Sequence, residues 1–454
     1  MKLGSSLTEG PIAKKYIAFI IPILLSGVMQ QLYNTADILV VGKFVGDTAL
    51  AAVGSTGSIT HLILNMFIGL SVGTNVLCAH LYGANDKEGA SRALHTSILL
   101  AVLSGVFLAV VGFAFSRTFL TLMGSPSNVI DDATLYMQIF FLGSPASMLY
   151  NFGSAVLRAA GDTKRPFYIM IFSGIVNVVL NLFCVLVLKI GVAGVAIGTV
   201  ASQIVSAIMV LYFLMKNTDC FKLRLSRLRL FKREIIEIIT IGVPSGLNGI
   251  MFSLSNVIIQ STINSFGKIA IAGASATTNI ENYGFILFSS VEQGAITFVG
   301  QNMGAKKINR VKSVAKIALY SAFVCAAIYT AVTIIWGEAL LSLFTDDISR
   351  DAVIAMGMVK MTITSFSYII FAPAQAFSGV LKGMGKSVEV TVANAVCTCV
   401  VRILWIIFIF PLNPVLEMVY LAYPISWGLS SIATTIIYFA VRNKVFNKEL
   451  STLS

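Results

Sequence analysis

The sequence predicts an all-α polytopic membrane protein, with twelve transmembrane helices in two pseudo-symmetric six-helix lobes. Its 454 residues are 57% hydrophobic and only 11% charged, whereas soluble domains carry roughly 25% charged residues. Polar stretches are short, with none much beyond about 25 residues, which leaves no room for a soluble domain. The apolar segments and an internal repeat supply the number and the grouping of the helices.

Twelve apolar segments follow one another along the chain, and each is long enough to cross a bilayer at 1.5 Å per residue. In the first half we expect spans near 16–42, 50–82, 93–115, 133–156, 166–189 and 192–215. In the second half we expect spans near 236–264, 270–301, 314–336, 353–380, 388–411 and 415–441. An even number of spans places both termini on the same side of the membrane.

The basic residues identify that side. Of the 32 Lys and Arg residues, 25 lie at the termini or in the loops on the terminal side, which predicts cytoplasmic termini in the cell inner (plasma) membrane. Their position in short loops suits contacts with anionic membrane lipids and argues against nucleic acid. The longest polar loop, a basic cytoplasmic linker over 217–235, separates an N-terminal lobe (1–216) from a C-terminal lobe (236–454). This linker either lies on the inner membrane face or serves as a plain connector.

The two halves repeat. Ile68–Gly73 and the following Leu81–Ala84 match Ser289–Gly294 and Asn302–Ala305 at a shift of 221, and Ala155–Gly161 matches Gly379–Gly385 at a shift of 224. Six spans per half give both halves the same orientation, a parallel repeat found in transporters whose substrate pathway runs between two bundles. This repeat argues against an enzyme on membrane anchors. The sequence contains no P-loop, His-Glu-x-x-His or nucleophile-elbow motif, which argues against ATP hydrolysis.

The first predicted span contains an acid, Asp37, about two thirds of the way along it. A carboxylate in mid-span costs about 2.5–3.5 kcal/mol on insertion scales, so it is expected to face protein or a water-filled cavity. Asn34 lies three residues earlier and therefore on nearly the same helix face. We interpret Asp37 as functional; the alternative is an Asp held permanently by hydrogen bonds to a neighbouring helix.

Other polar groups in the first half extend this site. Asn177 and Asn181 share one helix face, and Thr199 lies in the next span. Their oxygens are ligands that Na⁺ accepts, and they can equally hydrogen-bond a protonated Asp37; the alternative for the two amides is interhelical hydrogen bonding worth about 0.6 kcal/mol each. The matching second-half positions, near Ile258 and over 401–405, carry no acid. The predicted H⁺ or Na⁺ site is Asp37, Asn34, Asn177, Asn181 and Thr199.

The seventh and eighth spans of the chain, which begin its second half, contain acidic and aromatic residues. Glu281 and Glu292, the latter followed by Gln293, either bind a second cation or an organic cation or pair with a basic group, for which Arg402 is a candidate. Lys360 is expected near the outer interface. Side chains that can stack a flat cation, or simply pack, are Met251, Phe252, Tyr283, Phe285 and Phe288.

Pro22 lies in mid-helix in the first span and Pro244 in the matching place of the seventh. Loss of a backbone hydrogen bond at each proline allows a kink. We interpret Pro22 either as a helix-1 bend that switches during function or as a bend shared by both halves.

Three motifs resemble those of the MATE (multidrug and toxic compound extrusion) transporters, most closely their bacterial branch. They are Gln31–Asp37 with Val41–Gly42, Leu157–Lys164 and Phe298–Ala305, and the resemblance covers essentially all twelve spans. It implies two six-helix lobes in a V, rocking alternating access, and export of organic, cationic compounds in exchange for H⁺ or Na⁺, without another cofactor. It also implies a monomer.

Carried over residue by residue, the family's first-lobe cation site falls on Asp37, Asn177, Asn181 and Thr199, and its bending proline on Pro22. Many members have Asp where this chain has Asn181, which weakens Na⁺ binding and leaves Asp37 as the sole titrating group there. The acid that NorM-type members place in span 7 is Phe252 here. The rival functions are a flippase for a lipid-linked saccharide or other amphiphile, and a membrane receptor or assembly subunit that transports nothing.

Overall fold

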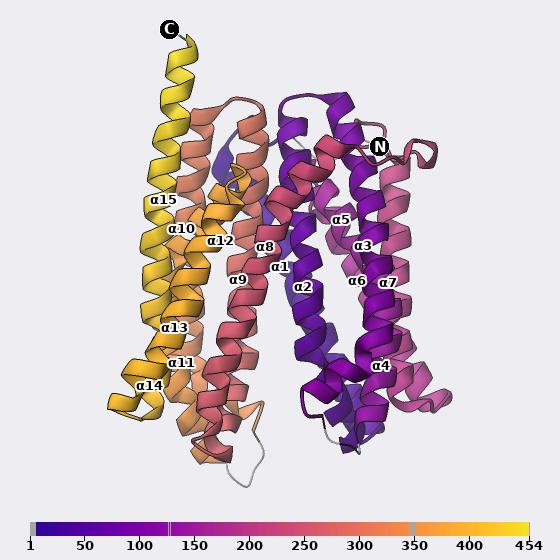
Figure 1. Ribbon diagram of the computed structural model, residues 1–454, viewed down its shortest axis with the longest axis vertical. Coiled ribbons are helices and arrows are strands. Elements are labelled where there is room, and N and C mark those ends of the chain that lie inside the picture. The colour runs from indigo at the N-terminus through magenta and orange to yellow at the C-terminus, as the bar shows by residue number, and fades with distance from the viewer. Residues whose placement is uncertain (1–5, 126, 128, 346–349, 454) are drawn as a thin grey trace. The chain divides into compact units, whose positions relative to one another are not determined.

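The computed structural model describes residues 6–125, 127, 129–345 and 350–453, and every regular element in these ranges is a helix (Figure 1). In the first half, α4 and α5 follow one another with only Gly143 between them, and a π-helical turn, η1 (Phe183–Val187), extends α6. The helices of this half are α1 (Ile12–Phe44), α2 (Asp47–Gly83), α3 (Lys87–Leu122), α4 (Ile130–Leu142), α5 (Ser144–Ala159), α6 (Lys164–Leu182) and α7 (Gly191–Lys216).

The second half repeats this order after a short 3₁₀ turn, η2 (Leu225–Arg227), in the linker. Its long helices are α8 (Lys232–Asn264), α9 (Lys268–Gly304), α10 (Ile308–Ser342), α11 (Arg350–Gly383) and α15 (Ala422–Leu453). The segment that matches α6 combines regular and π-helical turns, and is made of α12 (Ser387–Asn394), η3 (Ala395–Val400), α13 (Val401–Leu404), η4 (Trp405–Ile409), the 3₁₀ turn η5 (Phe410–Leu412) and then α14 (Leu416–Tyr420).

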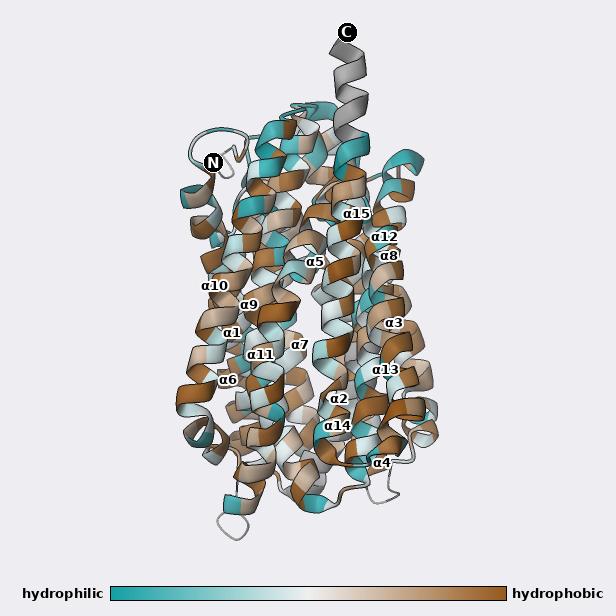
Figure 2. Cartoon of the chain, turned by 90° about the vertical axis from the view of Figure 1, so that its left-hand side faces the viewer, coloured by the Kyte–Doolittle hydropathy of each residue, from teal (hydrophilic) through white to brown (hydrophobic). Residues whose placement is uncertain are grey.

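The helices have the length and composition of membrane spans. Within the described residues, ten are long and apolar enough to cross a bilayer, and the remaining two predicted spans correspond to the broken pair α4–α5 and to the more polar α9. Figure 2 shows hydrophobic residues along the helices and hydrophilic ones concentrated toward their ends. The expected fold class, an all-α membrane protein of twelve spans, is therefore confirmed.

The backbone shows the internal repeat more clearly than the sequence does. Gly46 and Gly267 precede α2 and α9 with φ of 113° and 90°, and Gly161 and Gly385 follow α5 and α11 with φ of 86° and 78°. A third matched pair with positive φ, Asn85 and Lys306, has φ of 56° at both positions. Because left-handed backbone is rare outside glycine, its recurrence at matched places indicates that the same turns join both sets of helices.

The chain divides into two compact units, and the division runs through two helices. Unit 1 contains Ile21–Gly246, and unit 2 contains Thr8–Ile20 and the chain from Leu247 onward. The first turns of α1 thus pack with unit 2, where the Tyr16 hydroxyl donates to the Val291 carbonyl at 2.7 Å, and the first turns of α8 pack with unit 1. The sequence boundaries at 216 and 236 did not indicate this exchange, because periodicity shows where a helix runs but not which neighbours it has.

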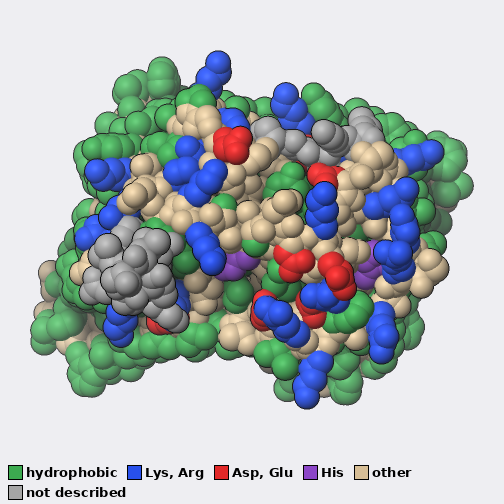
Figure 3. Space-filling view, turned by 90° about the horizontal axis from the view of Figure 1, so that it is seen from above, with side chains coloured by type: hydrophobic (Ala, Val, Ile, Leu, Met, Phe, Trp, Pro, Cys, Tyr) green, Lys and Arg blue, Asp and Glu red, His purple; other side chains and the backbone are tan. Residues whose placement is uncertain are grey.

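Figure 3 shows Lys and Arg side chains spread over the end of the molecule that it views. The linker itself is anchored in unit 1. The Arg224 amide donates to His95 Nε2 at 3.1 Å, Thr96 Oγ1 accepts from the Phe231 amide at 3.3 Å, and Phe221 is fully buried. The linker therefore packs on the beginning of α3.

Candidate functional site

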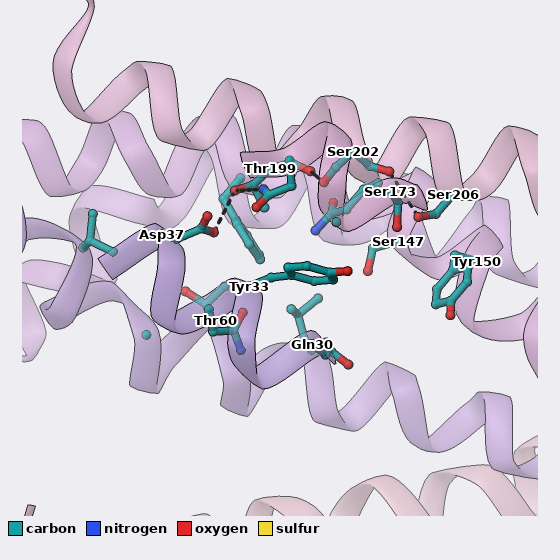
Figure 4. A pocket seen from close by; sticks show the side chains of 18 of the residues that line it. Gln30, Tyr33, Asp37, Thr60, Ser147, Tyr150, Ser173, Thr199, Ser202 and Ser206 are labelled. Atoms are coloured by element: carbon teal, nitrogen blue, oxygen red, sulfur yellow. Dashed lines mark hydrogen bonds between the residues drawn. The ribbon is translucent and has the colours of Figure 1, made fainter. Parts of the chain in front are cut away.

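Unit 1 contains a cavity of about 530 Å³ that is lined by residues from α1, α2, α4, α5, α6 and α7. Asp37 lies at its wall, and none of the described lining residues is Lys or Arg. Most polar lining groups are hydroxyls and amides, several of which are visible in Figure 4. They are Gln30, Tyr33, Asn34, Thr56, Thr60, Tyr136, Ser147, Tyr150, Asn151, Ser173, Asn177, Thr199, Ser202, Gln203 and Ser206.

The Asp37 carboxylate is held by neutral donors. Asn181 Nδ2 donates to Asp37 Oδ1 at 2.5 Å, and Thr199 Oγ1 lies 3.4 Å from Asp37 Oδ2. The Thr199 hydroxyl has a nearer acceptor in the Val195 carbonyl, at 2.9 Å. Because a hydroxyl has one proton, Thr199 can donate to only one of these oxygens at a time. Its oxygen therefore stays available to accept a proton from a neutral Asp37.

Asn177 connects these groups into one network. Its Nδ2 donates to Thr199 Oγ1 at 3.4 Å, and its Oδ1 lies 3.5 Å from Asn181 Nδ2. The two amides lie one turn apart on α6, and the π-helical turn η1 begins two residues after Asn181. Such turns interrupt a regular helix and are frequent at functional sites. The structure thus brings together the four residues Asp37, Asn177, Asn181 and Thr199 that the sequence grouped.

Glycines set how closely the helices approach at this site. A Cβ at Gly198 of α7 would lie 2.0 Å from Asn181 Oδ1, and a Cβ at Gly174 of α6 would lie 1.7 Å from the Tyr33 ring. The Tyr33 ring therefore lies directly against α6, where its hydroxyl donates to the Ile171 carbonyl at 3.3 Å. Any larger residue at 198 would displace the amide that holds Asp37.

Asn34 also lines the cavity, but it is exposed and lies beside the hydrogen-bonded group rather than in it. Sequence reasoning missed the polar stripe of α7. Ser202, Gln203 and Ser206 follow Thr199 at spacings of three, four and seven, which places them on one helix face, and all three line the cavity. That spacing was present in the sequence and could have identified them. Pro22 lies outside this cavity, in α1 at the boundary between the two units.

Glu281 of unit 2 is buried against Lys360, with 3.0 Å between Glu281 Oε2 and Lys360 Nζ. The close partner of Glu281 among the described residues is therefore Lys360 and not the candidate Arg402, and Lys360 is buried in the protein rather than extended toward water. Lys360 lies on the face of α11 that packs against α9, one turn after Gly357, so its ammonium reaches the acid directly. Helical periodicity gave the face of each helix but not which faces meet.

Glu292 lies three turns further along α9 and is also paired within unit 2. Its Oε1 accepts from Lys382 Nζ at 2.7 Å and from Ser378 Oγ at 3.0 Å, both on α11. The neighbouring Gln293 is half-buried. The alternative that these acids pair with basic groups therefore describes the structure, and the basic groups are lysines of one helix.

One of the rings predicted to stack a flat cation, Phe252, already faces a cation of the protein. The Arg402 guanidinium lies 5.7 Å from the ring centroid of Phe252, and it also faces Tyr423 at 4.4 Å and Trp427 at 5.9 Å. Arg402 also donates to Ser255, Asn256 and Ser426. Of the other predicted side chains, Phe288 stacks on Tyr368, Phe285 packs on Phe252, and Met251 and Tyr283 are half-buried.

Comparison with known proteins identifies the group to which this arrangement belongs. The family model described as MatE matches residues 22–183 and 244–408, well over half of the chain and most of both repeats. The match includes Asp37, Asn177 and Asn181 in its first part and Glu281, Lys360 and Arg402 in its second. The family match thus spans both units.

Curated relatives and solved structures extend over nearly the whole chain. The probable multidrug resistance protein YoeA of Bacillus subtilis is 28% identical over 83% of this chain and 82% of its own length. The multidrug export protein MepA of Staphylococcus aureus is 21% identical over 85% of this chain and 84% of its own length. The structure of a MOP superfamily transporter from Pyrococcus furiosus superposes with a TM-score of 0.90 at 22% identity, covering 98% of this chain and 99% of that chain.

Proposed function

The chain belongs to the MATE family of multidrug efflux transporters, and we propose that it exports organic cations in exchange for H⁺ or Na⁺ bound at Asp37. It is a multi-pass membrane protein and not an enzyme. The observation that carries the proposal is that Asp37 is the one charged residue among the described residues that line the cavity. A cation in the cavity and a cation at Asp37 would neutralise the same charge, so the two compete.

The cavity suits an organic cation in size and chemistry. Its volume of about 530 Å³ falls in the range of about 300–1,000 Å³ that is typical of sites for drug-sized molecules. Tyr33, Tyr136, Phe140 and Tyr150 line it and can stack on a flat ring or face a positive charge. The basic groups that a lipid-linked pyrophosphate would need are missing from the described lining, which favours the exporter over the flippase.

Asp37 can couple transport to an ion because its hydrogen bonds depend on its charge. As a carboxylate it accepts from Asn181, and as a neutral acid it can donate to Thr199 Oγ1, whose own proton is directed to the Val195 carbonyl. A ligand shifts a conformational equilibrium only through different affinities for the two states. In the proposal, this difference arises because α6 and α7 present these partners to Asp37 differently in the inward-open and outward-open states.

The arrangement suits a proton better than Na⁺. Asn181 presents its NH₂ group to Asp37, and Asn177 presents its NH₂ group to Thr199. Binding of Na⁺ would require both amides to turn their oxygens toward the ion, whereas protonation requires no such rotation. One elementary charge that moves through 100 mV contributes about 2.3 kcal/mol, which is enough to bias the alternation.

The remaining features of the proposal follow from the charges at the helix ends. We place both termini in the cytoplasm at the inner (plasma) membrane, because Lys and Arg gather at the terminal end. These side chains are also suited to contacts with anionic membrane lipids. The transporter acts as a monomer, with the cavity of unit 1 as its coupling site, and needs no cofactor besides the coupling ion.

The test is ethidium efflux from proteoliposomes in which a pH gradient and a Na⁺ gradient are imposed separately. We expect the pH gradient to drive efflux by the unaltered protein, and we expect Asp37→Asn to reduce this efflux to the level of empty liposomes. The matched control is Asp131→Asn, which makes the same chemical change in an exposed carboxylate paired with Arg117. Near-normal efflux by Asp37→Asn would overturn the proposal.

A further inference from the structure

The ammonium of Lys360 lies in a pocket of oxygen atoms on one face of α9. Its Nζ donates to Thr278 Oγ1 at 2.7 Å and to the Ala274 carbonyl at 3.3 Å, and it lies 3.0 Å from Glu281 Oε2. These residues are spaced by four and three along α9, so their oxygens line one side of the helix. An ammonium has three N–H donors, and each is matched by one oxygen.

Close packing of α9 on α11 sets this geometry. A Cβ at Gly273 would lie 2.8 Å from the Gly357 amide nitrogen, so the two helix backbones are nearly in contact there. The Thr277 hydroxyl lies 3.0 Å from the Gly357 carbonyl in the same contact. Lys360 follows Gly357 by one turn and extends along α9 with only 2% of its surface exposed. The lysine is therefore fixed by the fold and not free to reach water.

A carboxylate, a backbone carbonyl and a hydroxyl are the oxygen types that hard cations accept in proteins. One further oxygen of this group is unused, because Glu281 Oε1 is buried without a hydrogen-bond partner among the described residues. Tyr329, whose ring packs on Gly284 one turn from Glu281, also has a buried hydroxyl without a partner there. The group thus holds more oxygen atoms than the ammonium uses.

We propose that Glu281, Thr278 and the Ala274 carbonyl form a monovalent-cation site in unit 2 that the Lys360 ammonium occupies as a covalently attached cation. Unit 2 then binds no exchangeable ion while Lys360 is present. The inference goes beyond the proposed function, because it concerns a site in another unit and is tested by ion binding.

A plain structural ion pair explains less of this arrangement. Buried ion pairs are often no more stabilising than apolar side chains of the same volume, and ionisable groups inside membrane spans usually mark function. A pair that acted only as a structural tie would need the carboxylate and the ammonium alone. The additional carbonyl and hydroxyl contacts and the unused Glu281 oxygen are the features of a coordination shell.

The experiment compares purified variants that all carry Asp37→Asn, so that the carboxylate of unit 1 cannot contribute to Na⁺ binding. Thermal unfolding is followed in NaCl and in N-methylglucamine chloride of equal ionic strength. Asp37→Asn alone is expected to show no difference between the two salts. Asp37→Asn with Lys360→Met is expected to unfold roughly 5 °C higher in NaCl once Na⁺ reaches about a hundred times its dissociation constant. Adding Glu281→Gln should abolish that difference.

Two outcomes would overturn the proposal. The first is that the Asp37→Asn variant, with Lys360 intact, unfolds at a higher temperature in NaCl and loses this difference when Glu281→Gln is added. Na⁺ would then bind at Glu281 even though Lys360 is present, so the ammonium would not occupy the site. The second is a Lys360→Met variant whose unfolding temperature does not change with Na⁺. The proposal fails equally if this variant cannot be recovered folded in NaCl whereas the variant with both Lys360→Met and Glu281→Gln can. A failure of ethidium efflux leaves all of these measurements unchanged, so the two proposals fail separately.

Discussion

The acids of the two units differ in what neutralises them. Asp37 in unit 1 lies at the wall of a cavity, and its described partners Asn181 and Thr199 are neutral. Glu281 in unit 2 is buried between two closely packed helices and carries an ammonium from Lys360 at 3.0 Å. Only an acid without a counter-ion in the protein needs one from solution. The comparison shows that a repeated backbone can keep its turns while the acids of the two copies acquire different partners, neutral ones for Asp37 and an ammonium for Glu281.

A second difference supports this interpretation. The stretch of unit 2 that corresponds to Asn177 and Asn181 is 401–405, and it contains Arg402. Both stretches adjoin π-helical turns, η1 in unit 1 and η3 and η4 in unit 2. Arg402 is fully buried among Phe252, Tyr423 and Trp427, so a fixed cation stands where unit 1 has amides. Among the described residues, both Glu281 and the stretch that matches the amides are thus supplied with a cationic side chain in unit 2, whereas the partners of Asp37 in unit 1 are neutral.

The largest effect on stability is expected from Lys360→Met. This change leaves Glu281 buried and charged without its counter-ion, and loss of one partner of a buried pair costs about 3–5 kcal/mol. We expect the midpoint of thermal unfolding in Na⁺-free buffer to fall by about 10 °C. The double change with Glu281→Gln removes both charges and should restore most of the loss. If the single and double variants unfold at the same temperature, the pair contributes no electrostatic stabilisation.

A smaller effect, directed at unit 1, is expected from Gly198→Ala. The new Cβ would lie 2.0 Å from Asn181 Oδ1, so the amide must move away from Asp37. Overpacking of this kind costs about 1–3 kcal/mol, and we expect ethidium efflux to fall roughly tenfold. The control is Gly54→Ala in the same cavity, because a Cβ there meets nothing within 4 Å. Equal efflux by the two variants would show that the position of Asn181 does not matter.

The sequence was sufficient for the parts of the structure that depend on local pattern. Hydropathy gave the twelve spans, and the charge and spacing of Asp37, Asn177, Asn181 and Thr199 gave a group that the structure brings together. These predictions succeed because a polar side chain in a membrane span is costly to expose to lipid and therefore faces other polar groups or a cavity.

Features that depend on which helices meet were not accessible from the sequence. Lys360 was assigned to the interface, since a lone lysine in a span usually reaches toward water, and only the contact between Gly273 and Gly357 shows that it reaches Glu281 instead. The exchange of the first turns of α1 and α8 between the units was missed for the same reason. Periodicity gives the face of a helix, and tertiary packing selects its neighbour.

The smallest effect on stability is expected from Thr199→Val, and its comparison with a matched change in unit 2 tests whether Asp37 and Glu281 have different roles. Its hydroxyl lies 3.4 Å from Asp37 Oδ2, and loss of a neutral hydrogen bond costs about 0.5–1.5 kcal/mol. We therefore expect a small change in thermal unfolding but a severalfold loss of pH-driven ethidium efflux, because a neutral Asp37 loses the oxygen to which it donates.

The counterpart is Thr278→Val in unit 2, where the hydroxyl lies 2.7 Å from Lys360 Nζ. Hydrogen bonds to charged groups contribute about 1.5–3 kcal/mol, so this change should lower stability more than Thr199→Val while efflux by the folded protein persists. The reverse result, with efflux lost in Thr278→Val and stability lost in Thr199→Val, would contradict the assignment of ion exchange to Asp37 in unit 1.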